Sequence, residues 1–327
     1  MIKFAVIGSN WITEKFVHAT RIENELSLCA VYSRTLQSAQ VFADKFSVST
    51  CYDDLKAVEQ DKNIQAVYIA SPNSLHFQQS LQMLKAGKHV ICEKSLASNA
   101  KQVELLFQTA RDNNVILFEA YMTAHLPNFQ VIKDNLPKLG AIRKANIHYC
   151  QYSSRYQAYL DGKNPNTFNP QFSNGSIMDI GFYCVAFTVA LFGKPNKIQA
   201  SAQLLDSGVD GCGSALLSYD GFSVTIDHSK ISDSHLNNEI QGEDGVLQIE
   251  RVSLCEKVHL IPRVIESEKI DLSVAQVDNS MFYESQFFAK QIKANKMDEA
   301  TVERAKITAT VITEIRRLTG VKFPEDN

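Results

Sequence analysis

The sequence predicts an α/β protein with two domains: a doubly wound parallel sheet, then an α+β domain built on an open, mostly antiparallel sheet. The chain has 327 residues, and at about 150 residues per domain that length suggests two domains. Its first third alternates short β-rich runs with helical patterns, whereas after about Leu126 several β-rich runs follow one another without helices between them. We therefore expect a first domain over residues 1–122 and a second over 123–327.

The first domain is expected to hold a series of strands with helices between them. Strand, helix and strand at this spacing are typical of βαβ units in a parallel sheet. The expected strands cover residues 3–7, 26–33, 66–70, 89–91 and 115–118, and the expected helices cover 11–20, 35–46, 74–85 and 99–113.

The second domain is expected to contain an apolar helix at 176–191, then strands, then helices at 281–294 and 301–319 that could pack back on the first domain. An Asp-Gly pair at 220–221 lies between two β-rich runs and is a strong hairpin signal. Residues 242–245 indicate a second hairpin turn. Strands without intervening helices favour an antiparallel sheet. The β-rich runs cover 197–205, 214–219, 222–229, 238–241 and 246–250.

Composition and charge exclude several classes of protein. The chain is 45% hydrophobic and 21% charged, which excludes a disordered chain. Its net charge of −3 argues against a nucleic-acid-binding surface, since such surfaces are basic. No signal-peptide pattern follows Met1, and the apolar runs fall short of the roughly 20 residues that cross a bilayer. We therefore expect a cytoplasmic protein that binds neither nucleic acid nor a membrane.

The seven cysteines are scattered singly, without a Cys-x-x-Cys pair and without histidines at ligand spacing. In a chain without a secretion signal, this pattern indicates reduced thiols and no metal site. The cysteines are Cys29, Cys51, Cys92, Cys150, Cys184, Cys212 and Cys255.

The turn after the first expected strand carries the candidate cofactor residues Gly8, Asn10, Trp11 and Ile12. A dinucleotide site needs backbone N–H groups aimed at the pyrophosphate and a helix N-terminus behind them. Of the three glycines usual in this fingerprint only Gly8 is present, with Asn10 in the second place and Thr13 in the third. Because Asn tolerates positive φ, we expect the turn still to form. An ordinary strand-to-helix turn explains this motif alone equally well.

The second expected strand ends in Ser33 and Arg34, where NAD-preferring domains carry an acidic residue that binds the ribose hydroxyl. A carboxylate there would repel a 2′-phosphate, whereas a guanidinium pairs with it and can stack on adenine. The pair therefore predicts NADP(H) in preference to NAD. The competing interpretation is a surface arginine without a ligand.

Three further stretches, at 68–76, 93–97 and 175–183, resemble the glucose–fructose oxidoreductase / inositol dehydrogenase (Gfo/Idh/MocA) family. The resemblance extends over nearly the whole chain. Within the family, the sequence looks most similar to a bacterial branch near the dimeric dihydrodiol dehydrogenases and NADP-dependent xylose dehydrogenases. It implies a Rossmann domain followed by an open-faced sheet domain. It also implies hydride transfer between a nicotinamide and an alcohol or carbonyl of a sugar, polyol or related cyclic alcohol.

The resemblance places further cofactor residues after the third expected strand. The family's Pro-x-x-x-His segment, which lines the nicotinamide-side ribose, corresponds to Pro72 through His76. Ser71 and Asn73 belong to the same segment and are included in the expected cofactor site.

The family's Glu-Lys-Pro motif supplies a catalytic lysine, which corresponds here to Lys94 after Glu93, both of them expected at the cofactor. Ser95 replaces the proline. Because proline fixes its own φ and restrains the residue before it, we expect its loss to loosen the placement of Lys94.

The family's Asp-x-x-x-His/Tyr pair matches Asp179 and Tyr183. Hydride transfer needs a group that takes the hydroxyl proton and positive charge beside the developing oxyanion. Residues four apart share a helix face, and a nearby ammonium favours phenolate. We assign Tyr183 as proton donor or acceptor, Lys94 as electrostatic activator and Asp179 as orienting hydroxyl acceptor. The roles of Lys94 and Tyr183 could be exchanged, and without Lys94 the pair would suggest a packed helix face.

The weaker substrate-binding candidates are Glu119, Arg155 and Asn174. Glu119 could touch the nicotinamide ribose or cap the crossing between the domains. Arg155 and Asn174 belong to stretches rich in Arg, Tyr and Asn, which could line a polar pocket or form a solvated loop. His228 is expected to be structural, and Lys230 on the same β-rich run receives no role.

The motifs together predict an NADP(H)-dependent oxidoreductase. One alternative is a non-catalytic NADP(H)-binding regulatory protein, because the family pattern is broken at Asn10, at Ser95 and at Ala124, where many members carry arginine. Another is transient oxidation that leads to elimination or glycosidic cleavage on the same fold. We also expect a homo-oligomer, a dimer or tetramer, because an open sheet face would otherwise expose a large apolar area.

Overall fold

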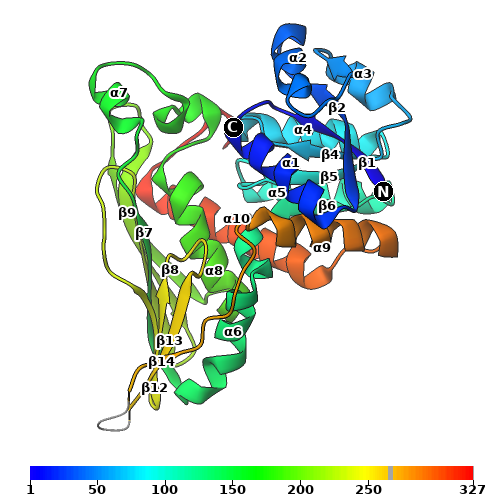
Figure 1. The fold of residues 1–327 in the computed structure, drawn as a ribbon. Helices are drawn as coiled ribbons and strands as arrows, with labels where there is room; N and C mark the ends of the chain where they lie inside the picture. The colour runs from blue at the N-terminus through cyan, green and yellow to red at the C-terminus, as the bar shows by residue number, and fades with distance from the viewer. Residues whose placement is uncertain (264–267, 327) are drawn as a thin grey trace. The chain divides into compact units, whose positions relative to one another are not determined.

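The computed structural model describes residues 1–263 and 268–326, and the chain divides into two compact units (Figure 1). Unit 1 comprises Met1–Met122 and Val277–Lys306, and unit 2 comprises Thr123–Gln276 and Ile307–Asn327. The segment that starts at Val277 therefore belongs to the unit that the first residues of the chain build.

Unit 1 is built on a parallel sheet with the strand order β3-β2-β1-β4-β5-β6. The order reverses between β1 and β4, and sheets of this kind bind ligands beside the carboxyl ends of the strands at that point. The predicted doubly wound sheet is confirmed. Its strands are β1 Ile2–Ile7, β2 Leu26–Tyr32, β3 Cys51–Tyr52, β4 Ala66–Ile69, β5 His89–Glu93 and β6 Leu117–Ala120.

The helices of unit 1 begin at residues that suit helix starts. Asn10, Thr35, Asp54 and Asn99 each accept a backbone N–H of the following turn with the side chain, which stabilises the exposed donors of a helix N-terminus. The late helix α9 packs against α1, and its Phe288 lies 6.0 Å from the ring of Phe118 on β6. The helices are α1 Trp11–Glu23, α2 Leu36–Asp44, α3 Leu55–Gln60, α4 Asn73–Lys85, α5 Ala100–Asp112 and α9 Met281–Ala294. Helix α10 Glu299–Thr319 begins in unit 1, and its residues from Ile307 on belong to unit 2.

Unit 2 is built on a mostly antiparallel sheet with the strand order β14-β13-β12-β11-β7-β10-β9-β8, which confirms the predicted class. Only β7 and β10 pair in parallel among the described strands. Both predicted hairpin turns form. The strands are β7 Ile142–Cys150, β8 Lys197–Leu204, β9 Asp210–Tyr219, β10 Phe222–Ser229, β11 Asn238–Gly242, β12 Gly245–Glu250, β13 Lys257–Pro262 and β14 Ile270–Asp271.

One face of the unit 2 sheet forms its core. Helix α8 Phe182–Phe192 packs on β7 and β10, preceded by the π-helical segment Ile177–Gly181 (Figure 1). Among the described residues, the other α-helices that lie wholly in this unit are α6 Pro127–Asn135 and α7 Tyr156–Leu160. Strand residues that face the helix are buried and apolar, for example Ile147, Val224 and Ile226.

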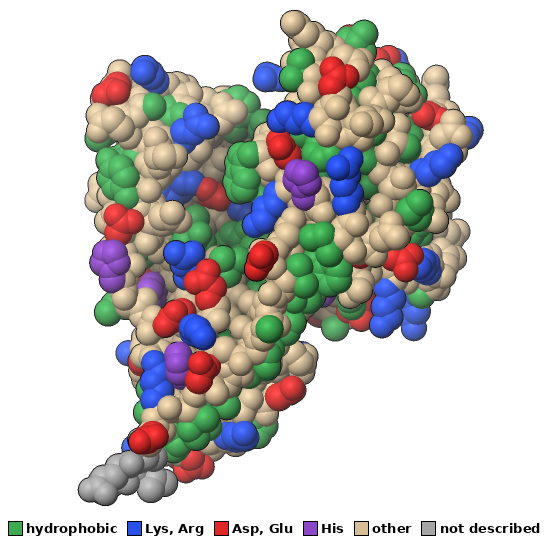
Figure 2. Space-filling view, in the orientation of Figure 1, with side chains coloured by type: hydrophobic (Ala, Val, Ile, Leu, Met, Phe, Trp, Pro, Cys, Tyr) green, Lys and Arg blue, Asp and Glu red, His purple; other side chains and the backbone are tan. Residues whose placement is uncertain are grey.

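The opposite face of this sheet is polar. One row across paired strands consists of Gln199, Leu216, Thr225, Asn146, Glu239, Gln248 and His259. The premise that this face exposes a large apolar area is therefore wrong for the described residues, and the expectation of an oligomer loses its support. On the side of the molecule drawn in Figure 2, basic and acidic side chains are interspersed.

The helical stretch Pro170–Phe192 has a mean hydropathy of 1.7 over 18 residues and is long enough to cross a membrane. It is not one continuous apolar run, because Asn174, Ser176 and Asp179 interrupt it. Of the window, 67% is buried inside the protein, as is typical of a core helix.

Candidate functional site

Gly8 and Asn10 shape the turn between β1 and α1. Gly8 has φ +108°, and a Cβ there would lie 2.9 Å from the carbonyl oxygen of Ala70, so glycine is required. The Asn10 side-chain oxygen accepts the N–H groups of Ile12 and Thr13 at 3.0 and 3.2 Å. Its amide nitrogen donates to Ala70 O at 2.7 Å. The interpretation that Asn10 is there to adopt positive φ is wrong, because its φ is −96° and its role is capping.

The predicted residues at the end of β2 lie beside this turn. Ser33 is buried, and its hydroxyl oxygen lies 3.2 Å from that of Ser9. Arg34 is exposed and has no ion-pair partner within residues 1–263 and 268–326. Trp11, the first residue of α1, is 74% exposed. The end of β2 thus presents an unpaired guanidinium, a group that binds anionic oxygens well.

Ser71 and Pro72 lie between β4 and α4, and Asn73 and His76 lie in the first turn of α4. Pro72 stands at the N-cap of α4 and Asn73 is its first residue. His76 is 1% exposed, with Nε2 2.8 Å from Ser71 O and Nδ1 2.8 Å from Ser95 O. Burial lowers the pKa of His76, an effect that the two carbonyl contacts oppose. His76 therefore ties the loop after β4 to the loop after β5.

Lys94 follows β5 directly, at the carboxyl edge of the sheet. The neighbouring Glu93 accepts a hydrogen bond from Tyr68 at 2.7 Å. The Lys94–Ser95 peptide bond is cis. Two residues beyond Lys94, the N–H of Leu96 donates to Glu119 Oε1 at 3.1 Å. Buried groups on both sides therefore hold the loop that carries Lys94.

Glu119 on β6 lies beneath that loop rather than on an open surface, since it is only 3% exposed. Burial raises the pKa of its carboxyl group to about 7, although Arg304 on α10 lowers it. Oε2 of Glu119 is buried without a hydrogen-bond partner among the described residues. The guanidinium of Arg304 lies 5.2 Å from the ring centre of Tyr121. Glu119 therefore supports the Lys94 loop from inside unit 1.

In unit 2, Asp179 lies in the π-helical segment and Tyr183 in the first turn of α8. Such segments occur frequently at functional sites. Asp179 forms an ion pair with Lys230, which directly follows β10. The ring of Tyr183 lies 5.8 Å from that of Tyr149 on β7. Both predicted catalytic residues of this unit therefore lie on one short helical stretch.

Lys230 is the residue that sequence reasoning missed. It stands two positions after His228, so its side chain points to the same inner face of the strand. A lysine that is buried in this way needs a partner of opposite charge. Its position in the sequence therefore indicates a nearby carboxylate.

The start of the same helical stretch is anchored by buried groups. His228 Nδ1 lies 2.8 Å from Ser176 Oγ, and the N–H of Ile177 donates to Asp210 Oδ2 at 2.7 Å. Burial raises the pKa of Asp210 to about 6 and lowers that of His228 to about 3. His228 therefore acts as a structural residue. A Cβ at Gly175, which has φ +137°, would overlap Asp210 Oδ1, so any other residue there strains the start of the segment.

The weaker substrate candidates of unit 2 lie in loops. Arg155 is exposed at the start of α7, and its N–H donates to Ser153 Oγ at 3.2 Å. The side chain of Asn174 accepts the N–H of Gly175 at 3.0 Å. Ala124 is partly exposed in the short 3-10 helix Met122–His125.

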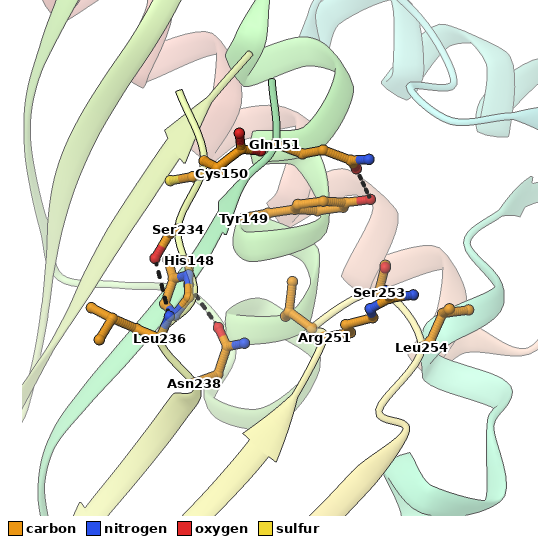
Figure 3. Close-up of a pocket in the computed structure, with 12 residues that line it drawn as sticks. His148, Tyr149, Cys150, Gln151, Ser234, Leu236, Asn238, Arg251, Ser253 and Leu254 are labelled. Atoms are coloured by element: carbon orange, nitrogen blue, oxygen red, sulfur yellow. Dashed lines mark hydrogen bonds between the residues drawn. The ribbon is translucent and has the colours of Figure 1, made fainter. Parts of the chain in front are cut away.

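A cavity of about 300 Å³ opens in unit 2 where β11 stops short of the end of β7 (Figure 3). None of the residues predicted from sequence lines it. Tyr149 is part of its wall and also contacts Tyr183. The side chain of Tyr149 therefore connects the cavity with the candidate acid–base residue. The lining residues are His148, Tyr149, Cys150, Gln151, Asp233, Ser234, Leu236, Asn238, Arg251, Val252, Ser253 and Leu254.

The chemistry available at these places is acid–base and electrostatic. In the part of the chain that the structure describes, no group of three or more His, Cys, Asp and Glu residues could hold a metal ion. Unit 1 supplies a glycine turn, an unpaired guanidinium and a lysine at a sheet edge. Unit 2 supplies a carboxylate paired with an ammonium, and a phenol.

Residues 2–121 match the family described as "Oxidoreductase family, NAD-binding Rossmann fold". Residues 136–248 match the "GFO/IDH/MocA C-terminal domain". These matches confirm the resemblance found in the sequence motifs.

Relatives that are similar over the full chain include two bacterial proteins. The protein named uncharacterized oxidoreductase YgjR of Escherichia coli is 54% identical and spans 100% of this chain and 99% of its own length. The scyllo-inositol 2-dehydrogenase (NADP(+)) IolU of Bacillus subtilis is 43% identical with the same coverage. Among solved structures, a 3-ketoreductase from Actinomadura kijaniata, in complex with NADP and TDP-benzene, has a TM-score of 0.87. It is 23% identical and covers 97% of this chain and 98% of its own, which shows the shared fold.

Proposed function

The chain belongs to the Gfo/Idh/MocA family of oxidoreductases, and from this premise we propose that it transfers hydride between NADP(H) and a sugar, polyol or related cyclic alcohol. It is an oxidoreductase with an NAD(P)-binding Rossmann fold. The observation that carries the finer proposal is the full-length 43% identity to a protein named scyllo-inositol 2-dehydrogenase (NADP(+)). The reacting group is a secondary alcohol, or the carbonyl formed from it.

Unit 1 offers a site that fits the charge of NADP(H). Gly8 allows the φ of +108° that the turn before α1 requires, and the N-terminus of that helix favours an anion such as a pyrophosphate. Arg34 is unpaired among the described residues, and with Ser33 it would bind the 2′-phosphate. Trp11, Ile12 and the residues 71–76 would hold the remainder. Bound there, the nicotinamide would accept or supply the hydride.

The acid–base work falls to Lys94, Asp179 and Tyr183. Tyr183 gives or takes the hydroxyl proton. The ammonium of Lys94 favours the phenolate and stabilises negative charge on the substrate oxygen. Asp179 accepts a substrate hydroxyl and orients it. The proposal requires that these groups from the two units meet at one carbon atom, and the roles of Lys94 and Tyr183 could be exchanged.

We assign residues 1–122 as the cofactor-binding domain and 123–327 as the substrate-binding domain, with 277–306 packed with the first. Arg155 and Asn174 are proposed to line the substrate side. The seven cysteines are free thiols, which supports a reducing compartment such as the cytoplasm. Because the open face of the unit 2 sheet is polar, it does not support the expected dimer or tetramer.

Cofactor preference is tested by following nicotinamide fluorescence while NADPH or NADH is added. We expect NADPH to bind about tenfold more tightly, because a charge-assisted pair with Arg34 is available only to its 2′-phosphate. Equal, weak binding of both would remove this part of the proposal.

The substrate class is tested by NADP⁺ reduction with scyllo-inositol, other inositols, aldoses and ketoses. We expect at least one cyclic polyol to be oxidised with a rate that saturates. Inertness toward the whole panel despite tight NADPH binding would contradict the proposed reaction. Cofactor that cycles without net consumption would instead favour elimination or glycosidic cleavage. The non-catalytic alternative is disfavoured, because the chain belongs to an oxidoreductase family and a relative that matches it over its full length is named as a dehydrogenase.

A further inference from the structure

Lys230 occupies a fixed position in unit 2. Its N–H donates to Gly211 O at 2.8 Å, and its carbonyl accepts the N–H of Ser153 at 2.9 Å. Its side chain is 7% exposed. The ammonium lies 6.0 Å from the ring centre of Phe168, an aromatic residue that is itself fully buried. Backbone contacts on both sides and packing around the side chain therefore leave the ammonium little freedom.

A buried ammonium must be paired, because desolvation without a counter-charge costs several kcal/mol. The partner of Lys230 is Asp179, whose side chain is 33% exposed. The pair therefore has a buried cation and a carboxylate that reaches the surface. Only the carboxylate is open to a small molecule.

The helical segment that carries Asp179 meets the ends of β9 and β10 at several points. Ser176 contacts His228, and Ile177 donates to Asp210. These contacts fix the start of the segment, whereas Lys230 acts on the carboxylate itself. The ion pair thus holds Oδ2 of Asp179 against a buried cation.

We propose that Lys230 is a positioning residue, which holds and aims the Asp179 carboxylate so that it can accept a substrate hydroxyl. This inference rests on the proposed function. Because Lys230 is buried, it acts through Asp179 and does not touch the substrate. The substrates that suit such a pair carry neutral hydroxyl groups, since the carboxylate charge is already compensated.

The test is a double-mutant cycle with Lys230→Met and Asp179→Asn, measured as kcat and KM for the fastest polyol found with the wild-type protein. We expect Lys230→Met to lower kcat/KM about 10²-fold, because small misplacements of a positioning group have effects of this size. In the Asp179→Asn background the same change should add less than about threefold, since interacting sites are not additive. Lys230→Arg should recover part of the loss by restoring the cation.

Lys197→Met is the matched control, because Lys197 is an exposed lysine on β8 of the same sheet. It should leave kcat, KM and NADPH affinity unchanged. Lys230→Met should also keep NADPH affinity, which shows that unit 1 is intact. If Lys230→Met folds and keeps its wild-type kcat/KM, or if the two losses multiply, the inference is overturned. Failure of the proposed function would appear earlier, as a wild-type protein that turns over no polyol.

Discussion

The two units hold their candidate catalytic groups in different ways. In unit 1, buried side chains hold the backbone around Lys94: His76 contacts Ser95 O, and Glu119 accepts the N–H of Leu96. In unit 2, the carboxylate of Asp179 is held by another side chain, the ammonium of Lys230. A backbone clamp fixes where a loop runs, whereas an ion pair fixes the charge and direction of one group. Changes in unit 1 should therefore act through loop position, and changes in unit 2 through charge.

The largest expected effect comes from removing the reacting groups on each side of this comparison. Lys94→Ala and Tyr183→Phe should each lower kcat about 10³-fold, the range typical of acid–base groups. Steady-state kinetics with NADP⁺ and the best polyol check this. Lys101→Ala, an exposed lysine on α5, serves as the control in unit 1. Wild-type rates in both variants would remove the catalytic assignment.

The next effect tests the anchor of the unit 2 segment. Gly175→Ala should lower the free energy of unfolding by about 3 kcal/mol, because the backbone strain and the overlap with Asp210 add. Gly162→Ala is the control: Gly162 has φ +76° and no atom within 4 Å of an added Cβ, so about 1 kcal/mol is expected. Denaturant unfolding measures both. Equal losses would show that Asp210 does not crowd the segment.

The stability that Glu119 gives to unit 1 should depend on pH. Burial raises the pKa of Glu119 from 4.5 to about 7, so the folded state binds a proton that the unfolded state has lost. The contribution of protonated Glu119 to the free energy of unfolding is fully present below pH 4.5 and is lost as the pH rises through 7. Glu119→Gln should remove this decline, which amounts to no more than about 3 kcal/mol. Urea unfolding at several pH values measures it.

A suitable control for that series is Glu303→Gln, an exposed glutamate on α10. It should keep the wild-type pH dependence. If Glu119→Gln also keeps it, another buried group is responsible, and the assignment of Glu119 as the titrating clamp is wrong.

The smallest effect concerns Arg34, which in contrast to Asp179 is exposed and forms no ion pair among the described residues. Arg34→Ala should weaken NADPH binding about tenfold, since one exposed charge-assisted pair is lost. NADH binding should not change. An equal effect on both cofactors would mean that Arg34 does not bind the 2′-phosphate.

Local patterns predicted much of the fold. The Asp-Gly turn at 220–221 and the turn at 242–245 stand between paired strands as expected, and α9 has the predicted bounds. In contrast, β3 has two residues and β14 also has two, which is too short for a period to be read. β7 was missed as well, and its parallel pairing with β10 depends on segments far apart in the chain.

The candidate site was predicted only where a motif is local. Gly8, Lys94, Asp179 and Tyr183 stand in short family motifs, whereas the pairing of Asp179 with Lys230 joins residues 51 positions apart. The position of Lys230 on a β-rich run indicates that it needs a partner, but no local pattern identifies Asp179 as that partner. The polar sheet face was predictable: Lys197, Gln199, Ser201 and Gln203 alternate along β8, a pattern typical of a solvated face.

We propose that Lys94 of unit 1 and Tyr183 of unit 2 act on the same secondary alcohol group of a polyol. The most direct measurement is a crystal structure with NADP⁺ and the best polyol found, in which the distances from Lys94 Nζ and Tyr183 Oη to the substrate oxygen are read. We expect both to lie within hydrogen-bond reach of one hydroxyl, with Asp179 on its neighbour. A substrate oxygen that only one of the two groups can reach would contradict the account.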